Sequence, residues 1–264
     1  MFKFIHSADL HLDSPLRGLA EKPDAPVEEI RSATRKALEN LVNLAIEEQV
    51  HFVLIAGDIY DGNWQDYSTG LFFNQQMNRL KEYGIPVFLI RGNHDAASVI
   101  TYKLVLPENV EEFSVKEPET KTIDEIQVAI HGQGYAQRDV RENLSVRYPD
   151  PIPGYFNIGI LHTALEGQEG HAPYAPARPD ELIKKGYDYW ALGHIHKRQI
   201  IHENPYIVYP GNIQGRHIKE TGEKGCTLVT VDGDTITLEH RNLDVLRFYE
   251  CHIDLTDIET EEDL

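Results

Sequence analysis

Seven side chains of the kinds that bind divalent metals lie in five short, widely separated blocks of this sequence. They comprise two carboxylates, one amide and four imidazoles: Asp9, His11, Asp58, Asn93, His162, His194 and His196. A mixed oxygen and nitrogen donor set suits Mn, Fe or Zn better than Ca or Mg, which prefer oxygen ligands. Seven donors exceed the needs of one catalytic ion but suit two ions, which can clamp the attacking and leaving oxygens of an in-line displacement. The set therefore predicts a two-metal phosphoesterase, in which a carboxylate such as Asp58 can bridge the ions.

The expected secondary structure brings these side chains together. Apolar runs predict strands at Phe2–Ser7, Phe52–Ala56, Pro86–Ile90, Tyr155–Leu161 and Tyr187–Leu192,. Each of these strands ends within a few residues of a candidate ligand, and ligands of open α/β sheets bind at the carboxyl ends of the strands. Gly57, Gly92 and Gly193 stand directly before candidate ligands. We expect them to allow the backbone turns that aim those ligands inward.

The remaining elements indicate two packed sheets. Helical spacing of apolar residues predicts helices at Val27–Gln49 and Tyr67–Tyr83,. Alternating strands and helices in the first half predict a parallel sheet with right-handed crossovers. The strand-rich second half is expected to form a second sheet against the first, with helices outside. Its further predicted strands are three short antiparallel ones, two pairs indicated by turn signals and a last strand: Val110–Val115, Thr120–Ile123, Gln127–His131, Gln199–His202 with Tyr206–Tyr209, Cys226–Val231 with Thr235–His240, and Phe248–Asp254,.

Composition narrows the class of protein. The 264 residues are 41% hydrophobic and 26% charged, which is ordinary for a globular protein,. The sequence contains no run of about 18 apolar residues, the length that would predict a membrane span. Cys226 and Cys251 are isolated, which suits a reducing cytoplasm,. The net charge of −18 argues against broad nucleic-acid affinity by this chain alone, although a partner could deliver a phosphodiester substrate,.

The ordered blocks resemble those of the calcineurin-like metallophosphoesterases. The matching segments span about residues 1–200 and are Asp9-Leu10-His11, Gly57-Asp58-Ile59-Tyr60-Asp61-Gly62, Gly92-Asn93-His94-Asp95, Leu161-His162-Thr163 and Gly193-His194-Ile195-His196,. The resemblance implies an α/β fold, a four-layer α/β/β/α sandwich with two mixed sheets. Residues 1–245 would form the metallophosphoesterase (nuclease) domain, and residues 246–264 would begin a C-terminal capping or linker region that is truncated here.

The resemblance also implies roles for individual residues. Two overlapping groups would each hold one ion: Asp9, His11, Asp58 and His196, and Asp58, Asn93, His162 and His194. His94 would be catalytic, protonating the leaving oxygen or steadying the phosphate, and Asp61 would orient it. Some exonuclease relatives carry histidine where this chain has Asp61, so the handling of a 3′ end stays open.

Three longer sequence segments resemble those of the DNA-repair exonuclease branch of this family, which contains SbcD-like proteins, and most closely those of the YhaO type. They are His6–Asp13, Tyr187–His196 and Tyr209–Arg216. This resemblance implies a manganese-dependent DNA exonuclease or endonuclease in DNA repair, with an SMC-like ATPase partner. A homodimer through Val27–Gln49 or Tyr67–Tyr83 would also follow. Relatives continue into a capping and ATPase-binding segment, so ATPase coupling is expected to be impaired.

Two alternative functions remain open. A hydrolase of small phosphodiesters or monoesters is favoured by the charge of −18. A non-catalytic binding scaffold of the same fold is disfavoured by the complete ligand set. Four further residues each have a functional and an ordinary interpretation. His171 would lie at the edge of the site, and Tyr174 would stack on a base or be a packed loop tyrosine,. Asn212 and Arg216 would contact phosphate, or belong to an ordinary tight turn with a solvated Arg,.

Overall fold

The computed structural model describes residues 1–14, 27–61, 66–97, 104–166 and 174–252, and two six-stranded sheets form its centre. The first sheet contains β1 (Phe2–Ser7), β2 (Phe52–Ala56), β3 (Val87–Ile90), β4 (Val110–Glu112), β11 (Gly225–Asp232) and β12 (Thr235–Asn242), in the order β12-β11-β1-β2-β3-β4. Strands β1 to β4 are parallel, β11 pairs antiparallel with β1, and β12 pairs antiparallel with β11. This sheet is therefore mixed.

The second sheet is also mixed. It contains β5 (Glu119–Ile123), β6 (Val128–Gly132), β7 (Phe156–His162), β8 (Tyr189–Gly193), β9 (Gln199–Glu203) and β10 (Tyr206–Tyr209), in the order β5-β6-β7-β8-β10-β9. The four central strands are parallel, and both edge strands are antiparallel to their neighbours. Two short 3₁₀ helices, Asp124–Ile126 and Leu144–Arg147, lie in its connections.

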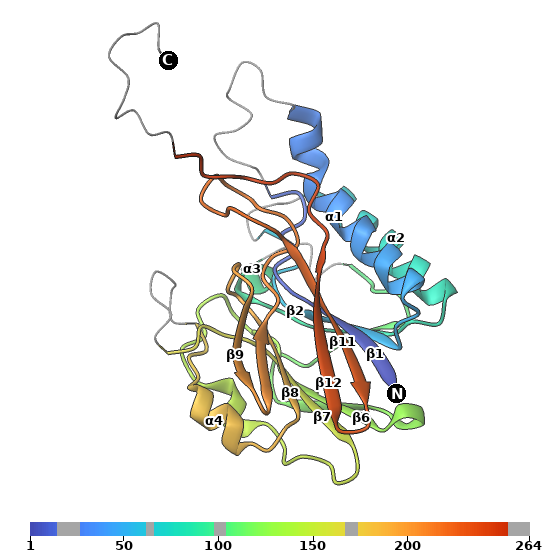
Figure 1. Cartoon of the computed structure of the whole chain (residues 1–264), viewed down its shortest axis with the longest axis vertical. Helices are drawn as coiled ribbons and strands as arrows, with labels where there is room; N and C mark the ends of the chain where they lie inside the picture. The colour runs from blue at the N-terminus through green and yellow to red at the C-terminus, as the bar shows by residue number, and fades with distance from the viewer. Residues whose placement is uncertain (15–26, 62–65, 98–103, 167–173, 253–264) are drawn as a thin grey trace, which may run out of the picture.

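Helices cover the outer faces of the two sheets. The long helices α1 (Val27–Glu47) and α2 (Tyr67–Glu82) run side by side against the first sheet, and α4 (Pro179–Lys184) lies on the opposite side of the molecule (Figure 1). Helix α2 begins where the Asp66 carboxylate accepts the Ser68 N–H at 2.8 Å, and it ends before Gly84, whose φ is +69°,. A single turn, α3 (Asn93–Ala97), follows β3. The arrangement confirms the predicted four-layer α/β/β/α sandwich with two mixed sheets.

Three buried clusters hold the layers together. One lies between α1, α2 and the first sheet, a second between the two sheets, and a third outside the second sheet under α4. The middle cluster is rich in aromatic side chains, with Phe4 and Phe52 stacked at 4.8 Å between ring centroids. Each such side chain contributes on the order of 1.5–3 kcal/mol when fully buried. The strand ends that carry the candidate ligands are therefore anchored on both faces.

Three predictions about the second half were wrong. Strand β4, predicted to be antiparallel among its sequence neighbours, instead pairs in parallel with β3 in the first sheet. The β11–β12 hairpin was correctly predicted as a hairpin, but it also joins the first sheet, because β1 needs a partner on its free edge,. No strand forms over the described part of Phe248–Asp254, where Phe248 makes only an isolated bridge to Thr221.

Candidate metal centre

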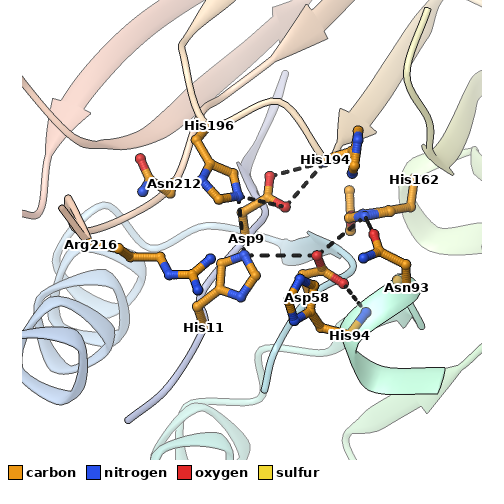
Figure 2. A network of polar contacts seen from close by, with 12 residues as sticks. Asp9, His11, Asp58, Asn93, His94, His162, His194, His196, Asn212 and Arg216 are labelled. Carbon is orange, nitrogen blue, oxygen red and sulfur yellow. Dashed lines mark hydrogen bonds and ion pairs between the residues drawn. The ribbon is translucent and has the colours of Figure 1, made fainter. Parts of the chain in front are cut away.

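The candidate ligands meet at the carboxyl ends of strands from both sheets. Strands β1, β2 and β3 of the first sheet precede Asp9, His11, Asp58 and Asn93, while β7 and β8 of the facing sheet deliver His162, His194 and His196 (Figure 2). Four of the residues hold left-handed backbone conformations, which are uncommon outside glycine: Asp9 (φ 53°), His11 (φ 42°), Asp58 (φ 55°) and His194 (φ 98°),. Such conformations persist where the surrounding structure demands them, and they cluster at functional sites.

The three glycines before the ligands serve two different purposes. Gly57 has a φ of +89°, as expected for a turn that aims Asp58 inward,. Gly92 and Gly193 do not have positive φ, so that explanation was wrong for them. A Cβ at Gly92 would lie 2.2 Å from Asp58 Oδ1, and a Cβ at Gly193 would lie 1.9 Å from the Ala56 carbonyl oxygen. These two glycines allow close packing of the ligand loops.

One half of the site gathers around His162. Its Nδ1 donates to the Ala56 carbonyl oxygen at 2.8 Å, because a carbonyl can only accept. The Nε2 of the neutral ring is then proton-free, and it faces Asn93 Oδ1 at 3.0 Å and Asp58 Oδ2 at 3.5 Å. Three acceptors converging in a fully buried position require a shared proton or a cation. The residues therefore fit a divalent ion at this point.

The other half of the site gathers around His196, whose ring is also held through Nδ1. His196 Nδ1 donates to Glu220 Oε1 at 2.6 Å, which leaves Nε2 directed at its neighbours. That Nε2 lies 3.1 Å from His11 Nε2 and 4.0 Å from Asp9 Oδ1. A metal ligand histidine ordinarily donates its other ring N–H to a carboxylate or carbonyl, which fixes the ring and its tautomer. Glu220 and the Ala56 carbonyl supply this support to the two histidines.

The donor atoms form three overlapping groups, in each of which all atoms lie within 4.8 Å of one another. The groups are Asp9, His11 and His196; His11, Asp58 and His94; and Asp9, Asp58 and His162. His194 takes part differently, because its backbone N–H donates to both Asp9 oxygens at 3.0 and 3.1 Å. Its ring packs against that of His162 at 5.3 Å between centroids. All seven predicted side chains thus lie in one site, and their assignment to individual ions stays a prediction.

His94 is held at the edge of this cluster by Asp61. The Nδ1 of His94 donates to Asp61 Oδ1 at 2.9 Å, and Asp61 Oδ2 accepts from Ser14 at 2.8 Å and from Arg216 Nη2 at 3.0 Å. The His94 backbone N–H also donates to Asp58 Oδ1 at 2.9 Å. The predicted contact between Asp61 and His94 is present, and it fixes the orientation of the His94 ring beside the candidate ligands.

The charges in the metal-free site respond to this geometry. Burial lowers the pKa of His94, but the Asp61 hydrogen bond and the Asp58 charge outweigh it, so the net pKa is raised,. Burial also lowers the pKa of His162, yet the charge and hydrogen bond of Asp58, the Asp9 charge and the Ala56 carbonyl together raise it to about 9. Burial raises the pKa of Asp9 to about 6. In the absence of metal, protons therefore occupy positions that a cation would take, and metal binding would release them.

Two supporting carboxylates were not predicted from the sequence. Glu220 holds His196; burial raises the pKa of Glu220, but the hydrogen bond and charge of His196 and the Arg216 N–H together lower the pKa to about 2. Asp95 accepts the N–H groups of Ile59 and Tyr60 at 2.9 and 3.0 Å and that of Gly92 at 3.0 Å, which ties two ligand loops together. Asp95 is the last residue of the recognised block Gly92-Asn93-His94-Asp95, so its position was a usable signal although no role was assigned to it. Glu220 lies in a loop with no motif, and nothing local marked it.

The four residues for which the sequence left two interpretations open differ in where the structure places them. Arg216 reaches into the site toward Asp61 and His11 (Figure 2), and so is not a solvated turn residue. Asn212 donates to Glu220 Oε2 at 2.9 Å and supports the same loop. Tyr174 packs edge-on against His194 at 5.4 Å between centroids, as expected for a packed loop tyrosine. His171 lies outside the described residues.

Comparison with known proteins settles the family. The family model for the calcineurin-like phosphoesterases matches residues 2–198. The chain belongs to this family. It is accordingly a metallophosphoesterase, from a family of phosphoester hydrolases that use divalent metals. The phosphoesterase fold and family predicted from the ordered blocks are confirmed.

Relatives narrow the resemblance further. The chain is 42% identical over 258 residues to "Uncharacterized metallophosphoesterase YhaO" of Bacillus subtilis, covering 96% of this chain and 63% of that protein. It is 28% identical over 241 residues to "DNA double-strand break repair protein Mre11" of Sulfurisphaera tokodaii, covering 84% of this chain and 59% of that protein. The chain thus spans about three-fifths of the length of these relatives. The predicted similarity to YhaO-type proteins and the repair branch is confirmed.

Solved structures support the fold independently. A dimetal phosphatase from Danio rerio superposes with a TM-score of 0.54 at 12% identity, covering 92% of this chain and 96% of that one. The TT1561 protein of Thermus thermophilus superposes with a TM-score of 0.52 at 12% identity, covering 92% of this chain and 99% of that one. At this identity the likeness concerns the fold. Within the described ranges, no helix combines the length and apolar character needed to cross a membrane.

Proposed function

We propose that this chain is a two-metal phosphodiesterase that cleaves DNA with manganese as its physiological ion, and Fe or Zn as chemically suitable substitutes. The observation that carries the proposal is the pair of histidines His162, which is fully buried, and His196, which is partly buried: the Nδ1 atom of each is committed as a donor while its Nε2 atom faces a carboxylate. Two such half-sites, which have Asp9 in common and are also linked through His11 and Asp58, match two ions better than one,.

The ions would be held by two groups that share Asp58. The first is Asp9, His11, Asp58 and His196, and the second is Asp58, Asn93, His162 and His194. When bound, the ions would supply Lewis acidity toward the phosphoryl oxygens and lower the pKa of a coordinated water. Burial of the carboxylates, with Asp9 1% and Asp58 2% exposed, would exclude bulk water from their inner faces.

His94 would act as the general acid on the leaving oxygen. Asp61 holds the ring by its Nδ1–H, so the Nε2–H of the charged ring points outward from that hydrogen bond. Arg216 stabilises the Asp61 carboxylate, which keeps Asp61 ionised and acting as an acceptor. The raised pKa of His94 favours the protonated form that an acid needs,.

The biological setting rests on the relatives. The Mre11 protein of Sulfurisphaera tokodaii is named for DNA double-strand break repair, which supports a DNA substrate and a repair role for this chain. We extend the proposal to an SMC-like ATPase partner, to a homodimer through the α1–α2 layer, and to the cytoplasm, where free Cys226 and Cys251 would stay reduced,. Residues 1–245 would be the catalytic domain and 246–264 the start of a capping or linker region.

A second candidate function is the hydrolysis of small phosphate esters. The net charge of −18 favours it, because a nucleic-acid backbone would meet an unfavourable overall field,. Both functions need the same metal centre and the same acid. They differ in whether the chain gains affinity from phosphates on either side of the scissile one.

One experiment tests the proposal and ranks the candidates. Metal-free protein is titrated with Mn²⁺ in a calorimeter and assayed with bis-p-nitrophenyl phosphate, plasmid DNA and hairpin DNA. The proposal predicts two bound ions and turnover of both the small ester and DNA. Turnover of small esters alone would establish the second candidate, and a folded protein that binds no ions would leave only a scaffold.

A further inference from the structure

A groove of about 610 Å³ opens beside the metal centre, with His196 in its wall. The loop after β8 contributes Lys197, and the connection between β10 and β11 contributes the rest of the lining: Arg216, His217, Lys219, Glu220, Thr221 and Lys224. The same connection supplies the support for His196, through Glu220. The groove and the half-site around His196 are therefore built from one pair of loops.

The groove has the opposite charge to the molecule as a whole. Across the sequence, 25 Lys and Arg residues face 43 Asp and Glu residues. In the groove lining, four cationic side chains accompany Glu220 as the one carboxylate among the described residues. Glu220 is already engaged by His196, Asn212 and the Arg216 backbone N–H. The groove therefore has a local excess of positive charge that would attract anions.

The lysines of the groove form no close ion pairs in the described part of the chain, although the charges of Glu220 and Asp244 act on Lys224. Elsewhere, Lys3 pairs with Glu48 at 2.9 Å and Arg91 with Glu112 at 2.6 Å. Within the described part of the chain, no ion pair joins Lys197, Lys219 or Lys224 to a carboxylate. Lys224 is 7% exposed, and its ammonium donates to the His196 carbonyl oxygen at 3.3 Å. Buried or clustered cations without carboxylate partners are typical of sites for anions.

We propose that this groove, defined by Lys197, Arg216, Lys219 and Lys224, binds the phosphates that flank the scissile phosphate of a nucleic-acid strand. The inference rests on the proposed phosphodiesterase function and names the part of the substrate that the metal centre does not touch. Arg216 links the two regions, because its Nη2 donates to Asp61 Oδ2 while its side chain also lines the groove. A strand that leaves the metal centre past His196 would meet these cations in succession. A small ester would not extend to Lys197 and Lys219.

The groove also resolves the conflict between the acidic chain and a DNA substrate. Each phosphate neutralised by a lysine releases condensed counterions, which favours binding and makes it depend on salt. A basic track beside the site gives this gain locally, while the surrounding negative field disfavours binding elsewhere on the surface. The chain would therefore bind a strand end or segment presented to its site, and would have little general affinity for DNA.

The test compares substrates of different length in the Mn²⁺-loaded protein. The double variant Lys197→Ala/Lys219→Ala and wild type are assayed with a single-stranded DNA octamer, a dinucleotide and bis-p-nitrophenyl phosphate over a range of salt. The ratio of kcat/KM for the octamer to kcat/KM for the small ester should fall about tenfold. The slope of log kcat/KM for the octamer against log salt should become shallower by about 1.4, at about 0.7 per phosphate contact.

Lys184→Ala is the matched control. Lys184 is an exposed lysine on α4, which precedes the amino end of β8, whereas the candidate ligands follow the carboxyl ends of the strands. Its ratio and slope should equal those of wild type. An unchanged ratio in the double variant would overturn the proposal. So would inorganic triphosphate competing as strongly as the octamer, because the groove would then be a polyphosphate pocket.

Failure of the groove and failure of the proposed function give different results. If wild type hydrolyses no ester with any metal, the catalytic proposal fails, and fluorescence anisotropy of a labelled octamer on the metal-free protein still tests the groove. Weaker octamer binding by the double variant than by Lys184→Ala would support the groove, and equal binding would refute it. If wild type hydrolyses the small ester and the double variant keeps full octamer selectivity, only the groove proposal fails.

Discussion

Replacing Glu220 with glutamine tests whether a carboxylate outside the ligand set controls metal affinity. Glu220 Oε1 accepts the His196 Nδ1–H at 2.6 Å, and Oε2 accepts from Asn212 at 2.9 Å and from the Arg216 N–H at 2.7 Å. Burial raises the pKa of Glu220, but the hydrogen bond and charge of His196 and the Arg216 N–H together lower the pKa to about 2, so the acceptor is ionised at neutral pH. Glutamine keeps the shape but has only one acceptor oxygen for donors on both sides.

The expected loss follows from the strength of that hydrogen bond. A hydrogen bond to a charged group contributes about 1.5–3 kcal/mol. At about 1.4 kcal/mol per decade this is roughly 10–100-fold in affinity, the range measured when such supporting partners of metal ligands are removed. We therefore expect Glu220→Gln to weaken Mn²⁺ binding about 10–100-fold at the half-site that contains His196. The half-site around His162, whose Nδ1 is held by the Ala56 carbonyl, should keep its affinity.

Calorimetric titration of metal-free protein with Mn²⁺ at pH 7 measures both affinities. Glu223→Gln is the control, because Glu223 is a nearby exposed carboxylate that pairs with Arg247 at 3.3 Å and does not reach the ligands. Circular dichroism melting of each metal-free variant shows whether it folds. Two unchanged dissociation constants in a folded Glu220→Gln protein would refute the role assigned to Glu220. Equal weakening at both half-sites would refute the division of the ligands into two groups.

Three further predictions concern the centre and its surroundings. Asp58→Ala should abolish binding of two ions, because the shared carboxylate is lost; inductively coupled plasma analysis after desalting would count them, and two retained ions would contradict the sharing. His94→Ala should keep both ions while kcat falls about 10²–10⁴-fold, and loss of the ions would show that His94 is a ligand. Burial lowers the pKa of His6 to about 3. Below pH 6.5 the unfolded chain therefore binds the proton more readily than the folded one, and stability falls as the pH drops from about 6.5 toward 3 by up to about 1.4 kcal/mol per pH unit. Urea unfolding of metal-free His6→Asn should show a shallower pH dependence than wild type over that range, and an identical dependence would exclude His6 as a source.

The sequence by itself determined the ligand types and their positions along the chain. Apolar runs of five to seven residues predict the strands before the ligands from local composition, and the polar residue after each run marks a strand end. β1 and β2 have their predicted bounds, and the other strands before the ligands differ by one or two residues at their ends. Parallel strands align their carboxyl ends, so the convergence of Asp9, Asp58 and Asn93 on one edge followed from sequence pattern alone.

Only the tertiary structure decided which distant segments complete the site and the sheets. Strand β4 and the hairpin β11–β12 join the first sheet because β3 and β1 offer free edges there, and edge pairing depends on what lies nearby in space,. Glu220 reaches His196 across 24 residues, and Arg216 reaches Asp61 across 155. Neither contact has a local pattern, because hydrogen bonds between loops depend on how the two sheets pack. Local sequence thus determines the types of the ligands. The hydrogen bonds that support the ligands, and the basic groove beside them, arise from packing between segments far apart in the chain.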